Sequence, residues 1–89
     1  MYRIIISDEA ALQMIEFEKS DKSSFNKCQK FIDELRIHPK SGTGKVEPLK
    51  GRENYWSRRV NKKDRMVYSV VDDIVTVTII TVKGHYKDK

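Results

Sequence analysis

The stretch YWSRRVNKKDRMVYSVVDDIVTVTIITV, residues 55–82, decides the fold. It is rich in β-branched and aromatic residues, and polar breaks interrupt it at 61–64 and 72–73. This pattern predicts three strands, at 55–60, 65–71 and 74–82, and strands joined by such short turns form an antiparallel meander. Arg59 and Arg65 should then face each other across the first hairpin.

The residues before this stretch predict one more strand and two helices. Residues 2–6 (YRIII) are typical of a strand, and Ser7 is a good N-cap for a helix over about 8–20. A second helix is expected over about 23–37, ending at His38-Pro39. The apolar spacing places these residues on the inner helix faces: Ala11, Leu12, Met14 and Ile15 in the first, and Phe25, Cys28, Ile32 and Leu35 in the second.

A loop at 39–45 and a short strand at 46–50 connect the two halves, and Pro48 places that strand at a sheet edge. Helices followed by strands predict an α+β fold, in which two helices pack on one face of a twisted, mainly antiparallel sheet. With 89 residues, we expect a single domain over 1–89.

Composition indicates a folded, basic protein. Hydrophobic residues make up 38% and charged residues 35%, with a formal net charge of +5, which argues against a disordered chain. No apolar run approaches the roughly 18 residues that span a bilayer, and the N-terminus is too short for a signal peptide. The single cysteine, Cys28, suits a reducing compartment and is best explained by core packing. We therefore expect a cytoplasmic protein that does not bind membranes.

The positive charge is concentrated between Lys40 and Arg65. This window holds nine basic residues against three acidic ones, a net +6, so the rest of the chain carries −1. A surface that binds phosphate requires such a concentration. A solvated surface that aids solubility is the plainer explanation.

The candidate chemistry is general acid–base catalysis assisted by fixed positive charge. No ligand spacing for a metal and no complete nucleotide loop is present, so we expect neither a metal nor a cofactor. Glu47 lies between lysines and can accept a proton, and His85 titrates near neutral pH. Arg59 and Arg65 can hold a phosphate. A base, an acid and these cations would together suffice for metal-free RNA cleavage, in which the ribose 2′-OH attacks its own 3′-phosphate. Each element also has a plain explanation as a surface residue.

Three stretches carry a resemblance to a known family: GTGKVEPLK (42–50), YWSRRVN (55–61) followed by RMVY (65–68), and GHY (84–86). In these motifs, and in the length and order of its two-helix N-terminal half, the chain resembles the YoeB/Txe branch of the RelE-type toxins. The resemblance covers essentially the whole chain.

The resemblance implies a RelE/YoeB-like microbial RNase-type fold and a toxin of a type II toxin–antitoxin module. Such toxins cleave mRNA in the ribosomal A site, in contact with rRNA, and a YefM/Phd-type antitoxin neutralises them. The resemblance also implies a possible homodimer or a toxin–antitoxin hetero-oligomer. By motif, Glu47 resembles the general base and His85 the general acid. The other expected site residues are Arg65 and Tyr86 in the catalytic group, and Lys45, Lys50, Arg58 and Arg59 as phosphate-binding cations.

Two alternatives remain open at this point. The chain could be a non-catalytic toxin of the ParE type, which has a related fold and lacks this acid–base set, or a basic RNA- or ribosome-binding module. Primer extension on ribosome-bound mRNA separates them from a nuclease, because only a nuclease produces discrete breaks.

Overall fold

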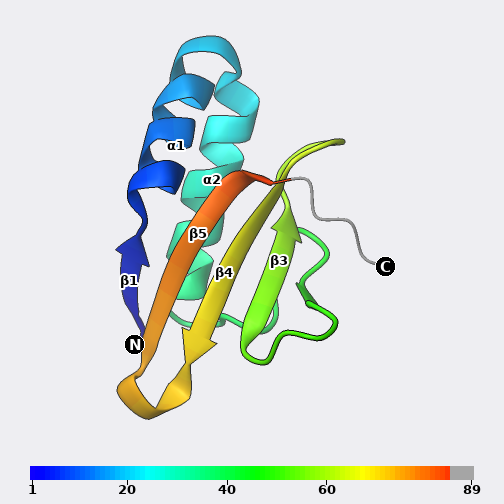
Figure 1. Ribbon diagram of the computed structural model, residues 1–89. Helices are drawn as coiled ribbons and strands as arrows, with labels where there is room; N and C mark the ends of the chain where they lie inside the picture. The colour runs from blue at the N-terminus through cyan, green and yellow to red at the C-terminus, as the bar shows by residue number, and fades with distance from the viewer. Residues whose placement is uncertain (85–89) are drawn as a thin grey trace.

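The computed structural model describes residues 1–84 and contains the predicted meander (Figure 1). Strands β3 (Tyr55–Arg59), β4 (Arg65–Val71) and β5 (Thr76–Gly84) pair in antiparallel order. Arg59 faces Arg65 across the β3–β4 hairpin, which confirms that prediction. The register between β4 and β5 shifts on both sides of Val67, and at each shift β5 contains one extra residue.

Two further strands complete a five-stranded sheet in the order β1-β5-β4-β3-β2. Strand β1 (Arg3–Ile6) runs parallel to β5, and β2 (Glu47–Pro48) pairs antiparallel with β3. The sheet is therefore mixed but mainly antiparallel, and Pro48 lies on an edge strand, as predicted. Strand β2 is shorter than the expected 46–50, and proline, which lacks a backbone N–H, lies at its end.

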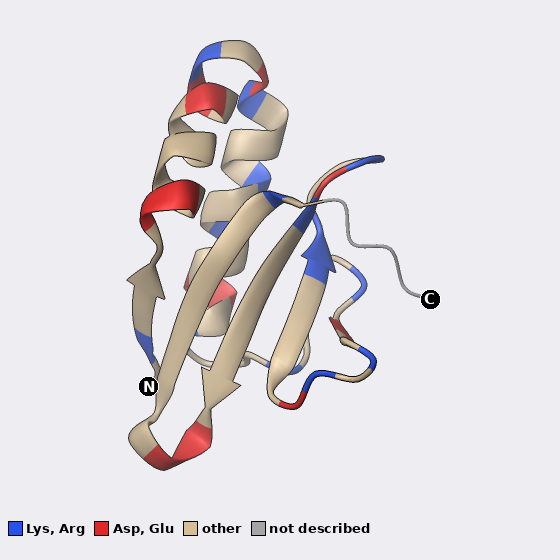
Figure 2. Ribbon diagram, in the orientation of Figure 1, with Lys and Arg blue, Asp and Glu red and all other residues tan. Residues whose placement is uncertain are grey.

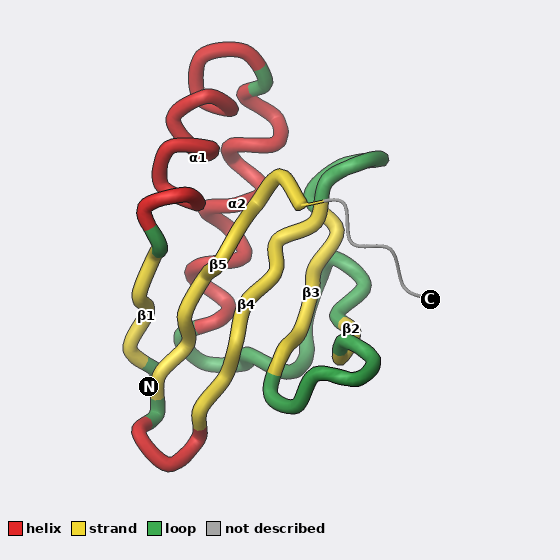
Figure 3. The backbone as a smooth tube through the Cα atoms, viewed as in Figure 1, coloured by secondary structure: helices red, strands yellow, loops and turns green. Residues whose placement is uncertain are grey.

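Helices α1 (Asp8–Ser20) and α2 (Lys22–Leu35) cover one face of this sheet and leave the other open (Figures 1 and 3). The α+β class, with two helices on one sheet face, is confirmed. No helix among residues 1–84 is long and apolar enough to cross a membrane.

Some boundaries differ from the predictions. The link between β4 and β5 is a short 3-10 helix, η1 (Asp72–Ile74), followed by Val75 at a φ of 48°, so β5 begins later than residue 74. Helix α2 ends before His38-Pro39, because the amides of Ile37 and His38 both donate to the carbonyl of Glu34 and close the last turn there.

The two helices differ in how well their inner faces were predicted. In α2, Cys28 and Leu35 are fully buried, and Phe25 and Ile32 pack against the core. In α1 the prediction was wrong: Leu12 is 63% exposed and Ile15 47%, Ala11 is exposed and only Met14 packs partly against the core, while Ala10 and Phe17 face the sheet.

The contacts at the N-terminus of α1 explain why a different face of the helix from the predicted one lies against the sheet. Ser7 donates through its amide to the carbonyl of Ile79 and through its hydroxyl to the carbonyl of Ile80, which anchors the helix cap to β5. Gln13 then faces the sheet, and its Oε1 accepts hydrogen bonds from Thr81 Oγ1 and from the amides of Val82 and Lys83. Because β1 ends at Ile6, α1 supplies polar partners for the next part of β5.

Candidate functional site

A carboxylate and a guanidinium lie side by side on the open face of the sheet. Glu47 of β2 is the register partner of Ser57 in β3, and its Oε1 lies 3.5 Å from Nη1 of Arg65 in β4. The same Nη1 donates to Ser57 Oγ at 3.3 Å. The Glu47 side chain is 50% exposed, so this ion pair is accessible from solvent. We call Glu47, Ser57, Arg59 and Arg65 the open-face cluster.

Arg59 adds a second positive charge to the open-face cluster. It is the direct cross-strand partner of Arg65, and its Nη1 donates to the carbonyl of Lys62. Its Nε is buried without a hydrogen-bond partner among residues 1–84, and no carboxylate of that part of the chain forms an ion pair with it. Two neighbouring guanidinium groups repel each other, and a bound anion would relieve both this repulsion and the unmet donor.

The lysines expected at the site lie on either side of the strand that carries Glu47. Lys45 and Lys50 flank β2, and both are exposed. Figure 2 shows basic residues, with a few acidic ones among them, along the loops beside β3 and at the β3–β4 end of the sheet, whereas the β4–β5 turn and the start of α1 carry acidic residues. The charge asymmetry of the sequence is therefore also an asymmetry in space.

His85 and Tyr86 lie outside the described residues. The last described residue, Gly84, is the register partner of Arg65. The described part of β5 therefore ends opposite the arginine that contacts Glu47.

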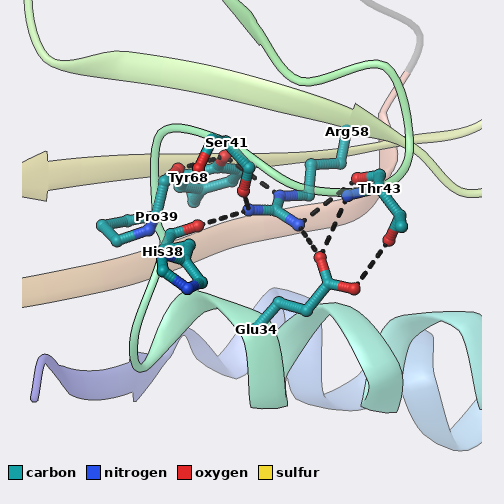
Figure 4. Close-up of polar contacts among 7 residues, drawn as sticks. All are labelled: Glu34, His38, Pro39, Ser41, Thr43, Arg58 and Tyr68. Atoms are coloured by element: carbon teal, nitrogen blue, oxygen red, sulfur yellow. Dashed lines mark hydrogen bonds and ion pairs between the residues drawn. The ribbon is translucent and has the colours of Figure 1, made fainter.

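Arg58 does not belong to the site, so the prediction that it contacts phosphate is wrong. Successive side chains of a strand point to opposite faces, and Arg58 points toward the helices and is fully buried. Its guanidinium donates hydrogen bonds to Glu34, to the Tyr68 hydroxyl and to three loop carbonyls (Figure 4). No donor is left for a substrate.

Two residues that pair with the arginines were not predicted from the sequence: Ser57, which accepts from Arg65, and Glu34, which pairs with Arg58. Ser57 precedes Arg59 by two residues in one strand, so the period-two rule places both on the same face, and this signal was available. Glu34 lies on α2, and only the tertiary fold brings its carboxylate to 2.6 Å from Arg58.

Other reactive groups of the described chain do not form a site. Burial raises the pKa of the Cys28 thiol to about 12, which leaves it protonated and confirms its packing role. Among residues 1–84, no three histidine, cysteine or carboxylate side chains lie close enough together to hold a metal ion.

Comparison with known proteins agrees with this architecture. Residues 7–86 match the family model described as YoeB-like toxin of bacterial type II toxin–antitoxin systems. Toxin YoeB of Escherichia coli K12 is 34% identical over 85 residues, which cover 94% of this chain and 99% of that protein.

Solved structures of relatives have the same fold. The YoeB dimer from Staphylococcus aureus superimposes with a TM-score of 0.83 at 32% identity, over 96% of this chain and 98% of that one. A heterotetrameric YoeB–YefM toxin–antitoxin complex from the same organism contains a chain with a TM-score of 0.78 at 31% identity, over 97% and 99%. On its sequence and its fold, the chain belongs to the YoeB-like toxins of bacterial type II toxin–antitoxin systems.

Proposed function

We propose that this toxin is a ribosome-dependent, metal-independent endoribonuclease that cleaves mRNA in the ribosomal A site and so inhibits translation. The observation that supports this most directly is the open-face cluster, where a solvent-accessible carboxylate lies beside one of two cross-strand arginines. A general base and a phosphate-binding cation must be this close to act on one nucleotide.

The proposed reaction is an internal transesterification. Glu47 takes the proton of a ribose 2′-OH, whose oxygen attacks the adjacent phosphorus. Arg65 and Arg59 stabilise the negative charge that grows on the phosphoryl oxygens. His85 gives a proton to the departing 5′-oxygen, so the products are a 2′,3′-cyclic phosphate and a 5′-hydroxyl end. Lys45 and Lys50 hold the flanking phosphates, and Tyr86 orients the substrate.

The expected partners follow from the same proposal. The ribosome holds its mRNA in a defined shape, which supplies the alignment of the 2′-OH with the leaving oxygen. Ribosomal RNA then forms the other wall of the site, and the protein works in the cytoplasm. We also propose a YefM-like antitoxin as the inhibitor and a homodimer as one assembly, since relatives were solved in both forms.

Replacement of the proposed base is the direct test. We expect Glu47→Gln to slow mRNA cleavage on stalled ribosomes by about 10²- to 10⁴-fold, because the amide cannot accept the 2′-OH proton. Glu53→Gln is the matched control: it removes another exposed carboxylate of the charged window, outside the open-face cluster. Primer extension gives the rates, and thermal unfolding confirms that both variants are folded.

Cleavage by Glu47→Gln at the rate of Glu53→Gln would exclude Glu47 as the base. Translation arrest by the unmodified protein without discrete breaks in ribosome-bound mRNA would instead favour a non-catalytic toxin of the ParE type or a ribosome-binding module.

A further inference from the structure

The buried Arg58 uses every donor that it has (Figure 4). An arginine carries five N–H groups. Nε donates to the Tyr68 hydroxyl at 3.2 Å, and Nη1 donates to Glu34 Oε1 at 2.6 Å and to the carbonyl of Thr43 at 3.3 Å. Nη2 donates to the carbonyls of His38 at 2.8 Å and Ser41 at 2.7 Å. Three of these five acceptors are main-chain atoms of the loop before β2.

Glu34 and Tyr68 hold the same loop from either side of Arg58. Glu34 accepts hydrogen bonds from the amide of Thr43 at 3.1 Å and from its hydroxyl at 2.9 Å. The Tyr68 hydroxyl donates to the carbonyl of Pro39 at 2.7 Å. The loop is thus fixed by polar contacts, and of residues 38–46 only Pro39 is buried.

Glycines permit this close approach. Gly42 has a φ of 124°, and a Cβ at this position would lie 2.6 Å from Glu34 Oε1. Gly44 has a φ of 89°, and a Cβ there would lie 2.5 Å from the Phe31 ring. The motif Gly-Thr-Gly therefore allows the loop to lie directly on Arg58, Glu34 and α2.

The loop leads directly to Glu47. The carbonyl of Gly44 accepts a hydrogen bond from the amide of Arg59 at 2.6 Å, three residues before Glu47. Strand β2 has only two residues, and it is held after Pro48 by the buried Leu49, whose amide donates to the carbonyl of Tyr55. So short a strand cannot fix its own position, and the loop sets it from the N-terminal side.

We infer that the Arg58–Glu34 pair is a positioning device for Glu47, and this inference rests on the proposed nuclease function. Neither side chain touches the substrate. Together they fix the 38–44 loop on the helix side of the sheet, and the loop places the Glu47 carboxylate on the opposite side, next to Arg65. A displacement of about 1 Å at a reacting group can slow catalysis by about 10²-fold.

A double-mutant cycle tests the inference on ribosome-bound mRNA. We expect Glu34→Gln to lower the maximal cleavage rate by about tenfold or more, with little change in KM, because the phosphate-binding arginines stay in place. In a Glu47→Gln background the same change should cost nothing further, since its effect passes through Glu47. Thr43→Val removes only the hydroxyl that donates to Glu34, from an exposed residue, and should lower the rate by about threefold. This variant replaces Glu34→Gln as the test if Glu34→Gln does not fold.

The control is Val77→Ala, a buried change on the helix side of the sheet, chosen to lower the unfolding midpoint by a similar amount. It should leave the cleavage rate unchanged. In addition, hydrogen exchange of the Arg59 amide should be faster in Glu34→Gln than in Val77→Ala, because this amide donates to the loop.

The outcomes separate the inference from the proposed function. Equal losses from Glu34→Gln in both backgrounds, or an unchanged rate in Glu34→Gln and Thr43→Val, would overturn the positioning role and leave the nuclease proposal intact. A Glu47→Gln protein that cleaves normally would overturn both.

Discussion

Arg58 and Arg59 are adjacent in the sequence but lie on opposite faces of β3. The alternation of side chains along a strand directs Arg58 into the core, where Glu34 neutralises it, and Arg59 to the open face beside Arg65. The sequence predicted the cross-strand pairing of Arg59 with Arg65 correctly, because strand register follows from short turns. Alternation alone separates Arg58 from Arg59, but it could not reveal the partner that makes burial of Arg58 possible, because that carboxylate lies 24 residues away on a helix.

The acid sensitivity of the fold should depend on Glu34. Partial burial acts to raise the pKa of this carboxyl, but hydrogen bonds from Thr43 and Arg58 outweigh it, and the pKa lies below its usual value of 4.5. Its contribution to stability is therefore complete above the unfolded pKa and is lost as the pH falls through the folded pKa. We expect Glu34→Gln to lower the free energy of unfolding by about 2 kcal/mol at pH 7.

This difference should shrink below about pH 4.5, where the carboxyl takes up a proton in the unfolded chain, and should be lost at the lower pH at which the folded protein is protonated. Urea unfolding at pH 7, 5, 4 and 3 measures it. Glu18→Gln, on the exposed side of α1, is the control and should give a small difference at every pH. A Glu34→Gln difference that stays constant with pH would show that the charge of Glu34 does not stabilise the loop.

At the scale of the elements, α2 was predicted well and α1 was not, for one physical reason. The inner face of α2 is mainly apolar, so its spacing reveals most of it, although the buried Ser24 and Phe31 were not part of the predicted stripe. The inner face of α1 includes Gln13, which is polar because it supplies an acceptor to the backbone of β5. A pattern that counts only apolar residues assigns such a glutamine to solvent. The predicted inner face of the helix then shifts to the side that carries Leu12 and Ile15.

Two identical substitutions test this assignment. Leu35→Ala removes a fully buried side chain and should lower the free energy of unfolding by about 2–5 kcal/mol. Leu12→Ala makes the same chemical change on an exposed face and should cost less than about 0.5 kcal/mol. Urea unfolding at low protein concentration measures both, so that self-association does not contribute. A similar loss of unfolding free energy in both variants would mean that the Leu12 side chain is buried in the folded protein.

At the scale of the whole molecule, folding changes the charge that a polyanion would meet. The window from Lys40 to Arg65 contains nine basic residues, but Arg58 is buried and Lys40 is paired with Asp72. The sequence predicted where the charge is concentrated, because charge follows composition. It could not distinguish structural cations from free ones, which requires the side-chain contacts of the folded chain.

The removal of different basic side chains should therefore change the salt dependence of RNA binding by different amounts. Each phosphate contact with single-stranded RNA contributes a slope of about −0.7 to log K against log salt concentration. We expect Arg59→Gln to reduce the magnitude of the slope by about that amount, because Arg59 forms no ion pair within residues 1–84 and lies on the open face. Lys27→Gln changes the net charge equally on α2 and should leave the slope unchanged.

Fluorescence anisotropy with a 2′-O-methylated oligonucleotide, which lacks the attacking hydroxyl, measures binding without cleavage. The distinction between the two variants depends on where the charge lies, since both lose one positive charge. Equal slopes for Arg59→Gln and Lys27→Gln would mean that RNA responds only to the net charge of the protein. A selective effect of Arg59→Gln would place an RNA phosphate next to the open-face cluster, where the Glu47 carboxylate lies beside Arg65.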